Sequence, residues 1–412
     1  MTTSQYSSTW PRPTVEERTW RSDLTAYPKP PRVERDPYLY AITIPPEIAG
    51  AQLLLPGPTT ALLEQASQAV TNLNRSAGAG HYELVAGPLL RSEAVASSKI
   101  EGLRASHRAL AEAREVPGVA KANAVAILNN VRAMEKAIDL AQQGPLTIDT
   151  IRDVHGCLAA GTSLEPHAGR LRDQQNWIGP SNHGPYNALY VPPPAQLVER
   201  LLDDLVRFAG RTDIPAIVQA GIVHAQFEAI HPFVDGNGRV GRTLIHAVLR
   251  RRGLSSRVVP ISTVLASRRE EYFSALAQFQ RDGEVVAWTD HFTVATAAAA
   301  RHAEDLGVEI TELVEDWRAR IGRRHADAAT GDLLPALVQH PVISAATAAQ
   351  RIGVTGQSSR RILGDLEQAG VVRQITAGRR NRVWAVDEVF DLLDRFEHTV
   401  AAGGDGTLTR PA

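Results

Sequence analysis

The sequence predicts a mostly α-helical protein that ends in a smaller module of mixed helix and strand. Alanine, arginine and leucine are frequent and aromatic residues make up only 5% of the 412 positions, a composition typical of helical bundles. Apolar residues also recur at helical spacing over most of the chain. From Gly331 onward the helical segments become short and two β-rich segments follow them, which predicts the mixed module.

Outside that module, helices are expected over residues 59–77, 89–101, 122–143, 148–160, 195–209, 214–230, 239–251, 262–282 and 286–306, the last continuing toward residue 323. Residues 1–36 are polar and interrupted by prolines, so we expect an extended arm docked by Trp10 or Trp20. Residues 161–194 are rich in Gly, Pro and Asn and too long for a simple connection between helices, which indicates a functional loop.

Composition limits the possible settings of the protein. The net charge of −1 gives no global electrostatic preference for a partner. Cys157 is the single cysteine, which excludes an internal disulfide and favours a reducing compartment. No apolar run approaches the length of a membrane span, and residues 1–27 lack the pattern of a signal peptide. We therefore expect a cytoplasmic protein without a membrane partner.

Residues 231–242 read His-Pro-Phe-Val-Asp-Gly-Asn-Gly-Arg-Val-Gly-Arg and carry the most chemistry in the chain. One helix is expected to end at His231, because the proline that follows disfavours helical geometry in the residue before it. Gly236 and Gly238 lie at the start of the next helix, where glycines let the backbone approach a phosphate and free N–H groups attract an anion. The loop therefore predicts a site for a phosphate-bearing ligand.

The side chains of the same segment fit this ligand. Arg239 and Arg242 lie about one helical turn apart, so two guanidinium groups can reach successive phosphates. Asp235 is a hard oxygen ligand suited to Mg²⁺. His231 can accept a proton near neutral pH. Together these residues can hold a nucleoside triphosphate and activate a hydroxyl beside it.

The segment also resembles the Fic motif, HxFx(D/E)GNGRxxR, with every defining position filled. The resemblance extends to residues 169–194, which look like the substrate-positioning flap of the family and include Tyr190 and Val191. Residues 38–55 resemble the N-terminal extension of many long Fic proteins, so the resemblance covers roughly residues 38–300. It implies a Fic helical-bundle core with a small flap hairpin.

The resemblance further implies a protein adenylyltransferase, which transfers AMP from ATP to a Ser, Thr or Tyr hydroxyl of a target protein. His231 would then be the catalytic base, Asp235 would hold Mg²⁺ and Phe233 would anchor the loop against the core. Gly238 favours AMP transfer, since relatives that phosphorylate carry lysine at this position. Contacts to the nucleotide would come from Gly236, Asn237, Gly238, Arg239, Gly241 and Arg242, with Tyr272 near the adenine.

A second motif lies upstream of the first. Residues 97–102 match the Fic inhibitory signature (S/T)xxxE(G/N) through Ser97, Glu101 and Gly102. The chain thus resembles the class with an N-terminal inhibitory helix, in which this glutamate pairs with Arg242 and keeps ATP in an unproductive pose. Some Fic enzymes use the same glutamate to remove AMP, so de-AMPylation stays open. Another nucleotide donor stays open as well, because contacts to phosphates do not read the base.

The C-terminal pattern resembles a winged helix-turn-helix domain. Helices over 333–339, 345–352 and 357–368 precede strands over 371–375 and 382–386. Six arginines against two acidic residues between positions 355 and 384 are the footprint of phosphate contacts, so DNA is a candidate partner, although winged helices also dock proteins. The arginines are Arg360, Arg361, Arg373, Arg379, Arg380 and Arg382.

The expected domains are an arm over 1–36, a helical region with the inhibitory helix over 37–143, a Fic catalytic core over 144–325, the winged helix-turn-helix domain over 326–400 and a flexible tail over 401–412. The alternative function is a DNA-binding transcriptional regulator in which the Fic core senses a nucleotide. The target protein is left open, with the chain itself as one candidate, and so is a homodimer.

Overall fold

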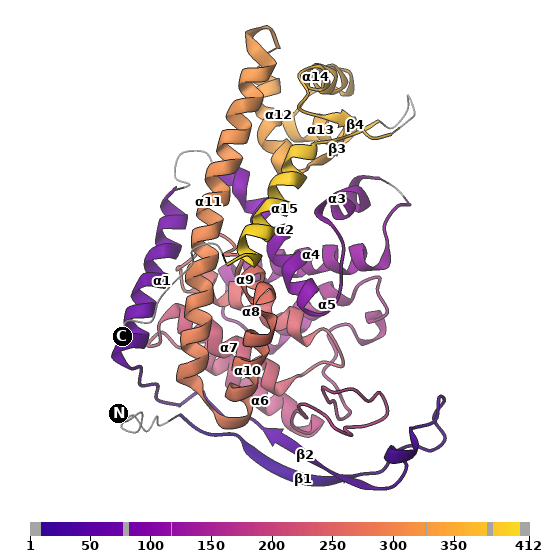
Figure 1. The fold of residues 1–412 in the computed structure, drawn as a ribbon, viewed down its shortest axis with the longest axis vertical. Helices are drawn as coiled ribbons and strands as arrows, with labels where there is room; N and C mark the ends of the chain where they lie inside the picture. The colour runs from indigo at the N-terminus through magenta and orange to yellow at the C-terminus, as the bar shows by residue number, and fades with distance from the viewer. Residues whose placement is uncertain (1–9, 77–81, 117, 326–327, 377–381, 404–412) are drawn as a thin grey trace.

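The computed structural model describes residues 10–76, 82–116, 118–325, 328–376 and 382–403, and most of them are helical, as the sequence predicts. Figure 1 shows one long helix, α11, running along most of the molecule, with a two-stranded ribbon at one end and a C-terminal module at the other. We use "C-terminal module" for the described residues of 328–403.

The helices before the module are α1 (Gly57–Ser76), α2 (Tyr82–Ile100), α3 (His107–Glu115), α4 (Ala122–Gln143), α5 (Ile148–Ala159), α6 (Ala195–Ala209), α7 (Ala216–Ile230), α8 (Asn237–Arg251), α9 (Ile261–Ser267), α10 (Arg269–Asp282) and α11 (Val285–His325). Single 3₁₀ turns lie at Arg32–Glu34 and Glu165–His167. The sequence missed α3, and α9 and α10 were expected as one helix.

The helices α7 and α8 form an antiparallel pair at the centre of the fold. Every residue of α7 from Ile217 to Ile230 is buried, which fits its apolar sequence on all faces. The pair packs against α4, α6 and α11, so the loop of residues 231–236 that joins α7 to α8 is held by helices on several sides. This packing fixes the position of the predicted site.

The N-terminal segment forms a ribbon instead of the lone arm expected over residues 1–36. Strand β1 (Thr14–Trp20) pairs antiparallel with β2 (Tyr38–Ile44), across the predicted boundary at residue 36. The docking role expected of the tryptophans is confirmed. Trp10 is buried with its ring 6.2 Å from that of Phe208, and Trp20 lies edge-on to Trp177, 5.4 Å between ring centroids.

The C-terminal module contains α12 (Ala328–Gln339), β3 (Val342–Ser344), α13 (Ala345–Ile352), α14 (Gly356–Gln368), β4 (Arg373–Gln374), β5 (Val383–Ala385) and α15 (Asp387–Ala401). Its three helices and following strands occur where the sequence predicts them. The sheet has a third strand that the sequence did not predict, and its order is β3-β5-β4. The final helix α15 was also missed, although it buries Val389, Leu393 and Phe396 at helical spacing.

The helix α2 begins seven residues before the predicted start at residue 89 and continues through Pro88. Burial of Leu84 and Val85 in the main core outweighs the cost of a proline inside the helix. On its other side α2 contacts the C-terminal module. Arg91 donates hydrogen bonds to the carbonyls of Gln339 (2.6 Å) and Val338 (3.0 Å) at the end of α12, which satisfies carbonyls that a helix leaves unpaired.

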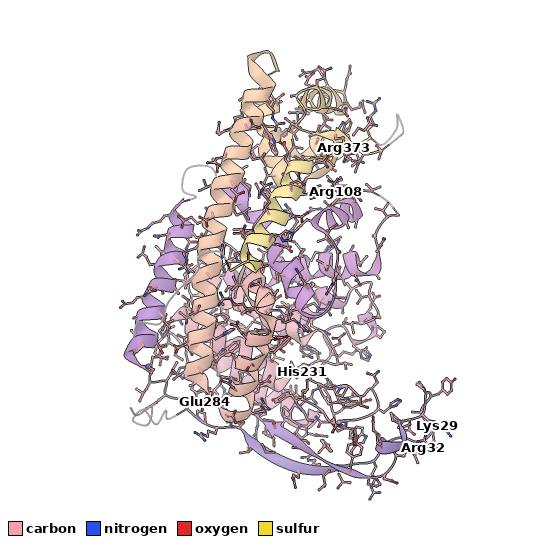
Figure 2. The ribbon with its side chains drawn as sticks, viewed as in Figure 1. Lys29, Arg32, Arg108, His231, Glu284 and Arg373 are labelled. Atoms are coloured by element: carbon pink, nitrogen blue, oxygen red, sulfur yellow. The ribbon has the colours of Figure 1, made fainter. Side chains whose placement is uncertain are left out.

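Ion pairs extend this contact beyond the end of α2. Glu397 of α15 lies 3.6 Å from Lys99 and 2.9 Å from the buried His107. Asp387 at the start of α15 accepts from both Arg108 and Arg373, which Figure 2 shows close together at the junction between α3 and the module. The helix that carries the inhibitory motif is therefore attached to the C-terminal module at its middle and just past its end.

In the described part of the chain, no helix combines the length and the apolar character needed to cross a membrane.

Candidate active site

The loop after α7 is held in shape by its own side chains. His231 ends α7 in the left-handed region (φ 51°, ψ 60°), and Gly236 adopts φ 81° at the start of α8. The Asn237 side chain accepts from the backbone N–H of Phe233 and donates to its carbonyl, both at 2.8 Å. Phe233 is fully buried and stacks on His155 with 3.9 Å between ring centroids, so the anchoring role predicted for it is confirmed.

Arg172 fixes the turn at His231 from the opposite side. It is 3% exposed, and its guanidinium donates to the carbonyls of His231 (2.8 Å) and Pro193 (2.5 Å), while its backbone N–H donates to the Pro232 carbonyl (2.9 Å). Its partners are carbonyl oxygens, so the guanidinium keeps its full charge beside the loop. Arg172 belongs to the segment that resembles the flap, but the sequence did not predict a role for it.

The imidazole of His231 is neutral at physiological pH. Burial lowers its pKa to about 4, and the nearby Arg172 cation acts in the same direction. A neutral imidazole has one nitrogen free to accept a proton, as the predicted base requires. Figure 2 shows His231 in the body of the protein, far from the C-terminal module.

Ser97 and Glu101, both at the end of α2, bind Arg242 of α8. The Arg242 guanidinium donates to the Ser97 hydroxyl (2.9 Å), to the Ser97 carbonyl (2.8 Å) and to Glu101 Oε1 (2.7 Å). Burial alone would lower the pKa of Arg242, but the Glu101 carboxylate raises it above its ordinary value. The two motifs, separated by more than a hundred residues in the sequence, thus meet in one ion pair.

The Glu101 carboxylate also lies over the first turn of α8. A Cβ added at Gly238 would overlap Glu101 Oε1, so a side chain at position 238 would displace the carboxylate. The helix dipole and unpaired N–H groups at this end favour an anion. Burial raises the pKa of Glu101, but Arg242 outweighs it and the net pKa is lowered, so the carboxylate is ionised. An internal anion therefore occupies the predicted anion site.

Two further residues of the motif border this position. Arg239 is 5% exposed, and its Nε is buried without a hydrogen bond to any described residue, so it can bind an added anion. Asp235 is exposed, and its Oδ1 accepts from the Gly236 N–H at 2.5 Å. Among the described residues, no group of three or more His, Cys, Asp or Glu side chains could hold a metal ion. A metal at Asp235 would therefore take its other ligands from phosphate oxygens and water.

Comparison with known proteins agrees with this geometry. Residues 145–249 match the Fic/DOC family model, and residues 60–139 match the model of the Fic/DOC family N-terminal region. Residues 60–249 thus carry a Fic domain and its N-terminal region. The two matches together include Ser97, Glu101 and the whole loop of residues 231–242.

Named relatives align with part of the chain. The chain is 37% identical over 102 residues to "Probable protein adenylyltransferase" of Aquifex aeolicus, covering 24% of this chain and 30% of the relative. It is 31% identical over 133 residues to "Protein adenylyltransferase fic-1" of Caenorhabditis elegans, covering 32% of this chain and 23% of the relative. The chain thus spans less than a third of the length of either relative.

One solved structure shares the fold over most of the chain. A Fic family protein from Desulfovibrio desulfuricans G20 aligns with a TM-score of 0.52 and 19% identity, covering 81% of this chain and 97% of that protein. The mostly helical Fic fold that the sequence predicts is therefore confirmed.

The predicted flap contacts the core through Tyr190 and Val191. Residues 161–194 contain one antiparallel bridge, between Ile178 and Tyr190. Tyr190 and Val191 are buried, and the Tyr190 hydroxyl donates to the Ala229 carbonyl at 2.8 Å. The Val191 carbonyl accepts from Thr43 of β2 at 2.9 Å. These two residues attach the flap to α7 and β2, and the exposed Ile178 and Leu189 are the apolar side chains that it presents.

Two of the residues predicted to contact the nucleotide have side chains engaged within the protein. Tyr272 is fully buried, and its hydroxyl lies 2.9 Å from Nε2 of His224, so its side chain packs in the core and has no exposed surface for the predicted adenine contact. The Asn237 side chain accepts from and donates to the Phe233 backbone, so the backbone N–H of Asn237 is the group at the start of α8 that we expect to contact a phosphate.

Sequence reasoning missed a buried polar cluster behind His231. His224 and Glu228 both belong to α7, and both are buried. Burial raises the pKa of Glu228 to about 8 and lowers that of His224 to about 3, so both are neutral near pH 7. Their i, i+4 spacing on a helix that ends at the site was the available signal, but an all-apolar α7 was the simpler interpretation.

Proposed function

We propose that this Fic protein is a protein adenylyltransferase, which transfers AMP from ATP to a Ser, Thr or Tyr hydroxyl of a target protein. The observation that carries the proposal is the position of a neutral His231 imidazole beside the N-terminal turn of α8, with Arg239 and Arg242 on that helix. The names of the aligned relatives support the same activity.

In the proposed reaction, His231 takes the proton of the target hydroxyl as its oxygen attacks the α-phosphorus of ATP. The bond to the bridging oxygen breaks and pyrophosphate leaves. The N–H groups at the start of α8 and the two arginines stabilise the negative charge of the phosphates. Such transfer is mostly a matter of positioning and charge stabilisation, which this loop can supply without a covalent enzyme intermediate.

Asp235 would hold Mg²⁺ together with phosphate oxygens. The site fits this ion, because Asp235 is exposed at the edge of the anion site and carboxylate oxygen is a hard ligand. When bound, the ion would neutralise part of the charge on the phosphates. The neighbouring Arg239 would supply positive charge from the protein side.

We further propose that Glu101 inhibits this reaction. Its carboxylate is bound to Arg242 and lies at the N-terminal turn of α8, where a phosphate would bind. An incoming ATP must displace it or bind without these contacts. The alternative use of Glu101, removal of AMP through a positioned water, rests on the same side chain and is distinguished by following loss of label from a modified target.

The second candidate role is DNA binding by the C-terminal module, whose element order supports a winged helix-turn-helix domain. Arg360 is exposed on α14, whereas Arg361 and Arg373 form ion pairs with Asp365 and Asp387. Arg379 and Arg380 lie outside the described residues. The test is the affinity of the full chain for duplex DNA as a function of salt. Binding without a salt dependence, or no binding, would remove the role.

The adenylyltransferase proposal is tested by incubating the protein with α-labelled ATP and Mg²⁺. The parent, Glu101→Gly and Glu101→Gly/His231→Ala forms are compared. Label on protein that appears in Glu101→Gly and disappears in the double variant would support transfer, inhibition and the role of His231 together. No label in any form, with proteins of a cell lysate added as targets, would favour another nucleotide or the regulator function. UTP and GTP are then tested in parallel.

A further inference from the structure

We propose that Glu228 is a positioning residue that sets the tautomer of His231. In its ionised form it would accept a hydrogen bond from the N–H at His231 Nδ1 and leave Nε2 unprotonated and free to act as the base. In its protonated form it would donate to Nδ1 and leave the proton on Nε2, where it blocks catalysis. The kinetic consequences rest on the proposed function, whereas the tautomer itself does not.

The two side chains are neighbours in the last turn of α7. Glu228 Oε2 lies 3.9 Å from His231 Nδ1 across an i, i+3 spacing. His231 Nδ1 and Glu228 Oε1 are both buried, and neither makes a hydrogen bond to a described residue. Leaving two buried polar atoms unpaired is costly, and a small rotation of the Glu228 side chain would pair them.

The opposite helix leaves space for this carboxyl group. A Cβ added at Gly241 would lie 2.9 Å from Glu228 Oε1 and 3.0 Å from His224 Nδ1. Any other residue at position 241 would therefore press on both side chains. The Fic motif leaves this position undefined, and the close approach of the polar cluster is a reason for glycine here that does not depend on the nucleotide contact expected of it.

The charge on Glu228 depends on whether Glu101 is present. Burial and the nearby Glu101 carboxylate both raise the pKa of Glu228, whereas Arg242 lowers it. While Glu101 neutralises Arg242, the protonated form of Glu228 is favoured. Withdrawal of Glu101 removes a like charge and leaves Arg242 without its carboxylate partner, so ionisation of Glu228 becomes easier.

Other groups also face the pair. The flap contributes Arg172 and Tyr190, α10 contributes Tyr272, the loop contributes Asp235, and α7 itself contributes His224. The backbone carbonyl of Glu228 raises the pKa of His231 as well. That carbonyl is present whatever residue occupies position 228, so a change of side chain isolates the carboxyl group.

The direct test is nitrogen NMR of the full chain labelled with ¹⁵N-histidine, with His231→Ala used to assign the signal. In the Glu101→Gly form we expect His231 to change from the Nε2–H to the Nδ1–H tautomer as pH rises from 6 to 9. In Glu101→Gly/Glu228→Gln the tautomer should not change over this range. A change that persists in the glutamine variant, or its absence in both, would overturn the proposal whether or not the protein transfers AMP.

The kinetic test uses the same two forms. As pH rises and Glu228 ionises, the rate of AMP transfer by Glu101→Gly should increase. The Glu101→Gly/Glu228→Gln variant should not show this increase with pH, and its kcat should be about 10–100-fold lower with an unchanged KM for ATP. Gln226→Ala in the Glu101→Gly background is the matched control, because Gln226 is buried on the same helix but donates to the Pro46 carbonyl. Equal pH profiles in the glutamine variant and the Gln226 control would contradict the proposal. No transfer by Glu101→Gly at all would count against the adenylyltransferase function instead.

Discussion

Replacing Glu101 by glycine should raise activity and lower stability at the same time. The change removes a charge-assisted hydrogen bond of 2.7 Å to Arg242, whose side chain is only 1% exposed. Glu101 itself is 36% exposed, so solvent screens part of the attraction. We expect a loss of about 1–3 kcal/mol in the free energy of unfolding, the range for a buried donor that loses a partner.

In the parent, ATP must overcome the free energy of the Glu101–Arg242 interaction in order to bind productively, and in Glu101→Gly this cost is absent. Because 1.4 kcal/mol corresponds to a factor of ten, productive ATP binding and AMP transfer at subsaturating ATP should rise by about 10–100-fold. Transfer is measured as protein-bound label from α-labelled ATP, and stability is measured by urea unfolding of the nucleotide-free protein. Glu101→Gln is the control, since it keeps the shape of the side chain and should lie between the parent and Glu101→Gly in both quantities.

Two combinations of results would refute this reasoning. If Glu101→Gly lost stability without gaining activity, Glu101 would be a structural partner of Arg242 and the site would be limited by something else. If activity rose with no change in stability, the ion pair seen here would contribute nothing to the fold and the mechanism of inhibition would lie in another contact.

Three further predictions follow from single contacts. Glu228 has a folded-state pKa near 8, above its unfolded value, so the folded protein binds one more proton than the unfolded chain and loses stability as pH rises from about 4.5 to 8. The Glu228→Gln variant should therefore be more stable than the parent to urea at pH 9. Equal stability of the two proteins at pH 9 would contradict the burial of an ionising carboxyl group. Arg172→Lys should lower the rate of AMP transfer by at least about tenfold, because lysine lacks the forked guanidinium that binds the His231 and Pro193 carbonyls. A rate equal to that of the parent would show that Arg172 is not needed to hold the turn at His231. Glu397→Ala should raise the rate of AMP transfer of the parent, by a smaller factor than Glu101→Gly does, because the loss of Glu397 releases Lys99 at the end of α2. In the Glu101→Gly background the same change should have no effect. An equal increase in both backgrounds would exclude action through Glu101.

The local features of the site could be predicted from the sequence because they depend on neighbours in the chain. The end of α7 before Pro232, the glycine-rich start of α8 and the one-turn spacing of Arg239 and Arg242 all follow from short-range rules. The pairing of Glu101 with Arg242 joins distant segments, and it was anticipated only through the resemblance to a family in which both motifs occur together.

Features that depend on packing between distant elements were missed. Nothing near Tyr272 in the sequence indicates that it would meet His224 in the core. The ribbon pairs β1 with β2 over a turn-rich segment without a recognisable hairpin signal, so the arm was expected to stand alone. Glu228 was overlooked because a carboxyl group inside an apolar helix becomes tolerable only when neighbours such as Gly241 leave space for it.

The attachment of α2 to the C-terminal module makes the two ends of the molecule thermodynamically dependent on each other. Arg91 donates hydrogen bonds to the end of α12, and a Cβ added at Gly87 would meet the Gln339 side chain, so the two helices are in contact at both positions. If withdrawal of Glu101 shifts α2, the shift also weakens these contacts between α2 and α12. A ligand that binds the module better once α2 has moved would then increase the affinity for nucleotide, and nucleotide would increase the affinity for that ligand by the same factor. A titration of the C-terminal module with its ligand would accordingly report whether nucleotide is bound at the Fic site.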